Sequence, residues 1–135
     1  MTRFDASEPE TRRALFVDAI VAHRTRASPF LTIEVDEAAL TDSSVESSAG
    51  VPWLQFGDGV VNLDCTESEL ERLKSLLPTF PAFKIDELTR PEGADGVNVQ
   101  VSAKADPNRI AQFLDAVLLE VYELPEDCLV WVVEL

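Results

Sequence analysis

Two cysteines are the side chains of this sequence with the clearest capacity for chemistry. Cys65 stands just before a predicted helix, and Cys128 stands just before the last predicted strand. If the strands beside them are antiparallel neighbours, the two thiols come close enough to form a redox-responsive pair. The dipole of the helix that follows Cys65 is also expected to lower the pKa of its thiol. Cys65 and Cys128 are therefore the candidate redox pair.

Two other interpretations of these cysteines stay open. They can be reduced and inert, because a buried cysteine usually behaves as a small hydrophobic residue. They can also bind a metal with help from Asp64, Glu126 and Asp127, although two thiolates without a histidine make an incomplete zinc ligand set. The only histidine, His23, falls in the first predicted helix with no nucleophile beside it. We therefore predict no catalytic residue, no resident metal and no cofactor, and the sequence points away from an enzyme.

A second candidate site is a polar face on two central strands. The segment 97–103 alternates, so its valines face one way while Asn98 and Gln100 face the other, together with Asn62 of a neighbouring strand. These uncharged amides could bind a small ligand or a partner. A sheet that recognises RNA carries stacking aromatic residues on its central strands and a basic surround, and the sequence predicts neither for these two strands. The alternative is that this face is solvated or lies beneath the N-terminal helix and the strand at 30–35.

Caps and periodicity predict the elements that position these residues. Three helices begin at N-terminal caps, which are Ser7 with Glu10, Thr66 with Glu69, and Asp106 with Pro107. Alternation of apolar and polar residues, or a short apolar run, predicts strands at 30–35, 51–56, 60–64, 82–88, 97–103 and 129–134. Gly57-Asp58-Gly59 predicts a hairpin between the second and third of these strands. The acidic, serine-rich stretch 36–50 predicts a mobile loop.

From residue 60 to 135 the predicted order is strand, helix, strand, strand, helix, strand. This is the βαββαβ order of a ferredoxin-like sandwich. We therefore predict an α+β fold in a single domain, 1–135, in which residues 1–59 add an N-terminal helix, a strand and a hairpin strand. A ferredoxin-like sheet makes its first and last strands neighbours, which is the basis for pairing the two cysteines. The last strand is apolar on both faces, so we expect the N-terminal helix to cover its second face.

The charge of the chain is its strongest compositional signal. It has 25 acidic residues against 11 basic ones, a formal net charge of −14, and only three lysines, Lys74, Lys84 and Lys104. A hydrophobic content of 46% argues against an acidic disordered chain. An acidic, lysine-poor surface is typical of proteins in molar salt, where the Debye length is ~3 Å and charge repulsion is screened. The alternative is an acidic nucleic-acid mimic that binds a basic protein.

Basic side chains gather in the N-terminal helix region, where Arg12, Arg13 and Arg24 lie. Such a helix could bind an anionic partner. Its broad apolar stripe around Phe16 and Ile20 favours docking on the acidic body of the protein instead, because an apolar stripe of this width has to be buried.

Two runs of the sequence resemble small acidic proteins of halophilic archaea that have no assigned function. They are WLQFGDGVVNLDCTESE (53–69) and DPNRIAQFLDAVLLEVYELPEDCLVWVVE (106–134). The resemblance covers the C-terminal part of the chain. It implies a salt-rich setting and supplies no site residues.

The sequence predicts a cytoplasmic, non-enzymatic binding or regulatory module with an unidentified protein or small-molecule partner. Direct nucleic-acid binding is not expected, because a phosphate backbone requires clustered Lys and Arg. No run approaches the ~20 apolar residues of a membrane span, and the first residues lack the apolar core of a signal peptide. The alternatives are a thiol-based redox or metal-responsive protein and the acidic mimic.

Overall fold

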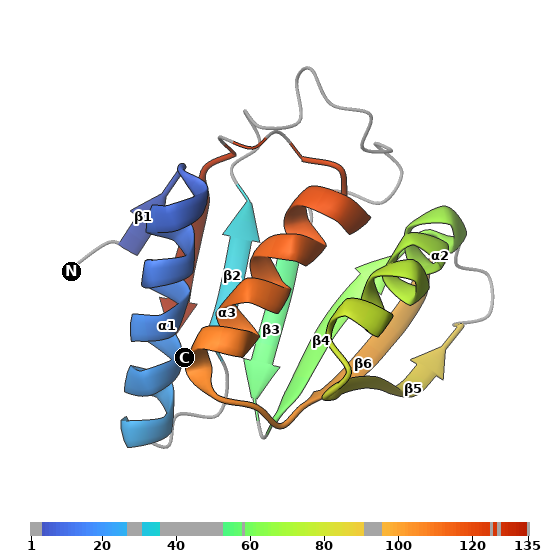
Figure 1. Ribbon diagram of the computed structural model, residues 1–135, viewed down its shortest axis with the longest axis horizontal. Helices are drawn as coiled ribbons and strands as arrows, with labels where there is room; N and C mark the ends of the chain where they lie inside the picture. The colour runs from blue at the N-terminus through green and yellow to red at the C-terminus, as the bar shows by residue number, and fades with distance from the viewer. Residues whose placement is uncertain are drawn as a thin grey trace.

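The computed structural model describes residues 4–26, 31–35, 53–57, 59–90, 96–124, 126 and 128–134. In chain order the elements are β1 (Phe4–Ala6), α1 (Pro9–Arg26), β2 (Leu31–Val35), β3 (Trp53–Gly57), β4 (Val60–Cys65), α2 (Glu67–Leu76), a 3-10 turn (Leu77–Thr79), β5 (Phe83–Thr89), β6 (Val97–Ala103), α3 (Pro107–Ala116), a π-helical turn (Val117–Val121) and β7 (Val130–Glu134). The described strands form one seven-stranded antiparallel sheet in the order β1-β7-β2-β3-β4-β6-β5 (Figure 1).

Two helices begin at the caps that the sequence predicts. The Thr66 hydroxyl accepts a hydrogen bond from the backbone N–H of Glu69, and the Glu69 carboxylate accepts one from the backbone N–H of Thr66. This reciprocal pair is a capping box at the start of α2. At the start of α3 the Asp106 carboxylate accepts from the backbone N–H of Arg109, with Pro107 in the first turn. Both predicted helix starts are confirmed.

The predicted hairpin is also confirmed. β3 and β4 pair as antiparallel neighbours, with Leu54 opposite Leu63. Gly59 has a φ of 73°, a positive value that a tight turn requires and that glycine adopts without steric cost. The predicted loop at 36–50 lies outside the described residues.

The α+β fold class and the βαββαβ order of the C-terminal part are confirmed, but one predicted neighbour relation is wrong. β7 pairs with β1 and β2, whereas β4 pairs with β3 and β6. The antiparallel pair β2–β3 therefore lies between the first and last strands of the βαββαβ unit (Figure 1). The physical reason is that β2 buries Leu31, Ile33 and Val35, so it belongs in the middle of the sheet, hydrogen-bonded on both sides.

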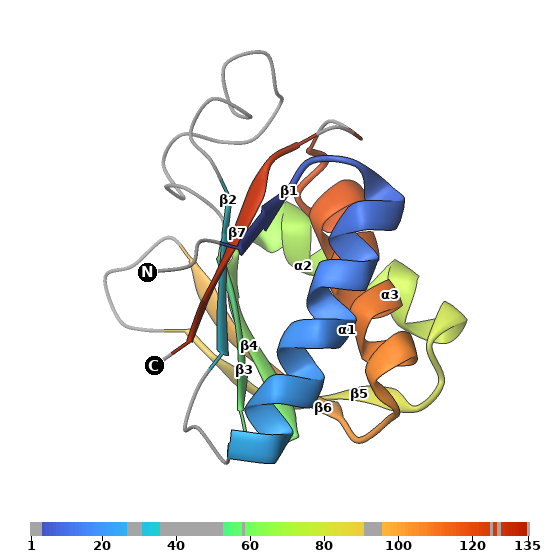
Figure 2. The same cartoon turned by 90° about the vertical axis from the view of Figure 1, so that its left-hand side faces the viewer.

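The three helices all lie on one face of the sheet, as Figure 2 shows from the side. The expectation that the N-terminal helix covers the opposite face of the last strand is therefore wrong. Two helices cover the four strands of a ferredoxin-like unit, and the strands added here widen the sheet. α1 covers the added width, packing beside α3 and over β7.

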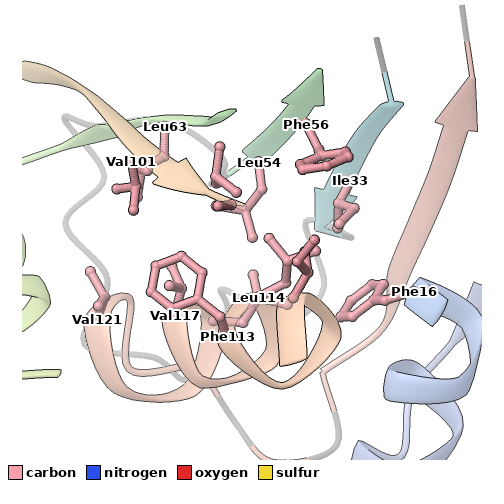
Figure 3. Packing of buried hydrophobic residues seen from close by; sticks show 14 of the residues in the cluster. Phe16, Ile33, Leu54, Phe56, Leu63, Val101, Phe113, Leu114, Val117 and Val121 are labelled. Carbon is pink, nitrogen blue, oxygen red and sulfur yellow. The ribbon is translucent and has the colours of Figure 1, made fainter. Parts of the chain in front are cut away.

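The apolar core lies between this helical layer and the sheet. Figure 3 shows Phe113 and Leu114 of α3 facing the strands, with Phe16 of α1 reaching the same core. Phe16 and Ile20 are fully buried, so the predicted docking of the N-terminal helix is confirmed. Val21, the residue after Ile20, is 48% exposed. Among the described helices, none combines the length and the apolar character needed to cross a membrane.

Candidate functional site

The face of the sheet that points away from the helices collects polar and aromatic side chains of the central strands. Alternate residues of these strands are buried beneath the helices, so the residues between them point to the opposite side. We call this set the open face: Thr32, Glu34, Trp53, Gln55, Asn62, Asp64, Asn98, Gln100, Ser102 and Trp131. Glu34 and Asp64 are exposed, and the other members are half-buried.

The three amide residues predicted for a sheet-face site lie together on the open face. Asn62 of β4 stands opposite Gln100 of β6. The Asn98 side-chain amide donates to the Asn62 side-chain oxygen at 2.8 Å and to a carboxylate oxygen of Asp64 at 2.9 Å. These bonds hold the polar side chains in place before any ligand arrives. The binding role of Asn62, Asn98 and Gln100 stays a prediction.

Sequence reasoning missed the tryptophans of this face. Glu34 of β2 stands opposite Trp53 of β3 on one side and Trp131 of β7 on the other. Continuing the β3–β4 register by one residue from Leu54–Leu63 places Trp53 beside Asp64. The expectation that the strands at 60–64 and 97–103 carry no aromatic residue is confirmed, and the tryptophans of this face lie on β3, next to β4, and on β7. The signal was present, since Trp53 and Gln55 alternate with the buried residues of β3.

The predicted approach of Cys65 to Cys128 rested on β4 and β7 being neighbours, and they are not. β2 and β3 separate these strands, which places β4 ~14 Å from β7 at ordinary strand spacing. A disulfide requires a Cα separation below ~7 Å. Both cysteines are buried, and they form no disulfide with one another.

The environment of Cys65 is the opposite of a reactive thiol site. Burial, followed by the negative charge of Glu69, raises the pKa of Cys65 from 9.0 to about 12. The predicted lowering of this pKa by the helix dipole is therefore wrong. Tyr122 contacts the thiol, and its hydroxyl donates to the backbone carbonyl of Asp64 at 2.5 Å. Cys65 is consequently neutral and shielded at neutral pH.

A buried ion pair joins the helical layer. Arg12 is 0% exposed, and its Nε donates to Asp115 Oδ1 of α3 at 2.7 Å. Its Nη1 donates to the backbone carbonyls of Ser7, Glu126 and Cys128 at 2.9, 2.6 and 3.1 Å. Sequence reasoning counted Arg12 among the basic side chains of the N-terminal helix region and did not predict its burial. The sequence did indicate this burial, because Arg12 lies four residues before Phe16 and therefore on the same side of α1.

Within the described ranges, no group of three or more His, Cys, Asp or Glu side chains is arranged to hold a metal ion. Asp127 and the side chain of His23, both considered at the sequence level, lie outside the described residues. The open face is thus the strongest candidate site.

A family model described as a family of unknown function (DUF7975) matches residues 1–135. The chain belongs to this family. The DUF7975 match takes in the N-terminal helix and strands as well as the βαββαβ unit. Comparison with curated proteins and comparison with solved structures found no match.

Proposed function

We propose that this protein is a non-enzymatic binding module that holds its partner on the open face of the sheet. The observation that carries the proposal is that α1, α2 and α3 all lie on one face of the sheet (Figure 2). The other side presents amide side chains of β3, β4 and β6, together with the tryptophans of β3 and β7. Each amide side chain can both donate and accept hydrogen bonds, and tryptophan is enriched at the centres of protein interfaces.

The cost of removing water supports this surface over others. The chain carries a net charge of −14, and removing water from a carboxylate costs far more than removing it from an amide. On the central strands of the open face only Glu34 and Asp64 are charged, while Gln55, Asn62 and Gln100 are neutral. A partner can therefore cover this centre at a smaller desolvation cost than a carboxylate-rich surface imposes.

The buried cysteines do not favour the alternative of a thiol-based redox protein. A thiol acts as a nucleophile in its thiolate form, and the raised pKa of Cys65 keeps it protonated at neutral pH.

We also propose that the protein works in the cytoplasm of a salt-rich cell. The net charge of −14 and the scarcity of lysine support this setting, because screening at molar salt removes the repulsion between carboxylates. The resemblance to acidic proteins of halophilic archaea supports it as well.

Phage-displayed random peptides, selected on the immobilised protein, test the binding role. The selected peptides are then measured against Gln100→Arg, which puts a long charged side chain opposite Asn62 on the open face, and against Glu120→Gln. Glu120 is an exposed residue of the π-helical turn on the helical side. We expect binding to the wild type and to Glu120→Gln, and at least a tenfold loss with Gln100→Arg. Failure to select any peptide, or equal binding to all three proteins, would contradict the proposal.

A further inference from the structure

We propose that Glu34, Trp53 and Asp64 of the open face bind the guanidinium group of an arginine in a peptide segment of a partner protein. This inference rests on the proposed binding function and names the chemistry of the partner.

The first support is the order of side chains across the sheet. Glu34 stands opposite Trp53, and the β3–β4 register places Asp64 on the other side of Trp53. Residues opposite one another on antiparallel strands have Cβ atoms ~4.5–5.5 Å apart. An exposed carboxylate therefore flanks the half-buried indole on each side. A group that lies on this ring comes within reach of both carboxylates.

The second support is the chemistry of the guanidinium group. It is planar, it stacks on the face of an indole, and its N–H groups form paired hydrogen bonds with carboxylates. A lysine ammonium is a compact point charge that lacks the planar fork. One aromatic ring between two carboxylates therefore suits arginine better than lysine. Either of these two cations suits it better than a neutral or anionic group does.

The third support is that Asp64 is held in place. The Asn98 amide donates to Asp64 Oδ1 at 2.9 Å, and the same amide donates to Asn62. This network orients the carboxylate before binding, so less conformational freedom is lost when the partner arrives. Gln55 and Asn62 lie in the adjacent row, where their amides can hydrogen-bond the backbone of a bound peptide.

The protein uses the same recognition chemistry within its own chain. The guanidinium of Arg109 lies 4.3 Å from the centroid of the Phe80 ring. The Arg90 guanidinium donates to both carboxylate oxygens of Glu67, at 3.0 and 3.2 Å. Trp131 stands on the other side of Glu34, but it already interacts with another group of the protein. The proposal therefore rests on Trp53.

The test uses three synthetic peptides on the full-length protein. Their sequences are identical, with acetylated and amidated ends and alternating glycine, and they carry arginine, lysine or citrulline at the variable positions. Citrulline keeps the planar shape of arginine without its charge. Binding is measured by calorimetry and by tryptophan emission in a Trp131→Phe background, where Trp53 is the remaining tryptophan of the two in the chain. We expect the arginine peptide to bind at least tenfold more tightly than the citrulline peptide, with lysine between them.

Variants locate the interaction. Trp53→Leu is expected to weaken binding of the arginine peptide at least tenfold, and Glu34→Gln and Asp64→Asn severalfold each. Glu120→Gln removes the same charge on the helical side and is the matched control, with no expected change. Equal weakening by Glu120→Gln would show non-specific attraction and overturn the inference. Equal affinity for the arginine and citrulline peptides would overturn the inference. It would also be overturned if neither peptide binds while the phage-selected peptides still require the open face. In both cases the proposed function would stand.

Discussion

Cys65 shows how burial decides the chemistry of a side chain whose type indicates reactivity. Its thiol lies at the end of β4, just before α2, where the helix dipole favours the thiolate. Burial has the larger effect, and the nearby charge of Glu69 acts in the same direction, so the pKa rises to about 12. The pKa of Tyr122, which contacts the thiol, is also raised, mainly by burial. Both groups therefore keep their protons to a higher pH in the folded protein than in the unfolded chain.

We expect the stability of the protein to fall as the pH rises from 9 towards 12. In this interval the folded protein retains the Cys65 proton that the unfolded chain has lost, so unfolding releases a proton and rising pH favours it. Each unit of pKa difference corresponds to ~1.4 kcal/mol, which sets an upper limit of ~4 kcal/mol for this thiol. Urea unfolding at a series of pH values measures the effect.

In the Cys65→Ala variant this pH dependence is expected to become weaker, with a residual slope from Tyr122. Val97→Ala is the matched control, because Val97 stands opposite Cys65 in β6 and is buried but does not titrate. That variant should lose stability by an amount that does not change with pH. An identical slope in wild type and Cys65→Ala would contradict the prediction.

At the scale of elements, the N-terminal segment is an integral part of the sheet and its helical layer. β2 pairs on both sides, and α1 is joined to α3 by the buried pair of Arg12 and Asp115. Arg12 also bonds three backbone carbonyls, two of which belong to the segment that leads into β7. One side chain thus connects α1, α3 and the start of the last strand.

Replacing Arg12 with methionine is expected to reduce the free energy of unfolding by ~3–5 kcal/mol, because it leaves Asp115 buried with its main partner removed. Arg13→Met is the matched control. Arg13 Nη1 reaches the other oxygen of Asp115 at 3.3 Å, but its side chain is 42% exposed. Water screens such a contact, so its loss is expected to cost ~0–1 kcal/mol. Urea unfolding of both variants tests the difference, and equal losses would contradict the assigned role of Arg12.

For the whole molecule, one sheet with helices on a single side gives two different surfaces (Figure 2). One face of the sheet forms the core with the helices, and the open face carries the candidate binding residues. The net charge of −14 makes the folded protein repel itself at low salt.

The free energy of unfolding is therefore expected to rise between 0.1 and 2 M KCl, as the Debye length falls from ~10 Å to ~3 Å or less. Denaturation with urea at several KCl concentrations measures this, since urea itself adds no ions. A variant in which the exposed residues Glu10, Glu87 and Glu120 become glutamine should show a smaller rise, because it has less repulsion to screen. Stability that is constant or falls with KCl would contradict salt adaptation.

The sequence by itself determined the parts of this protein that depend on neighbouring residues. The caps at Thr66 and Asp106 and the turn at Gly59 are set by hydrogen bonds and backbone angles within a few residues. Alternation in the strands likewise predicted that Asn98 and Gln100 share a face. These features give the α+β fold class and the order of its elements.

Only the tertiary structure decided which strands from distant parts of the chain are neighbours. The placement of β2 and β3 between β4 and β7 depends on hydrogen bonds between residues far apart in the chain, and element order alone does not specify it. That placement separates Cys65 from Cys128 and brings Trp53 between Glu34 and Asp64. The strongest candidate site is therefore the open face and not the two thiols. Side chains from distant segments of the chain become neighbours only when the sheet is assembled.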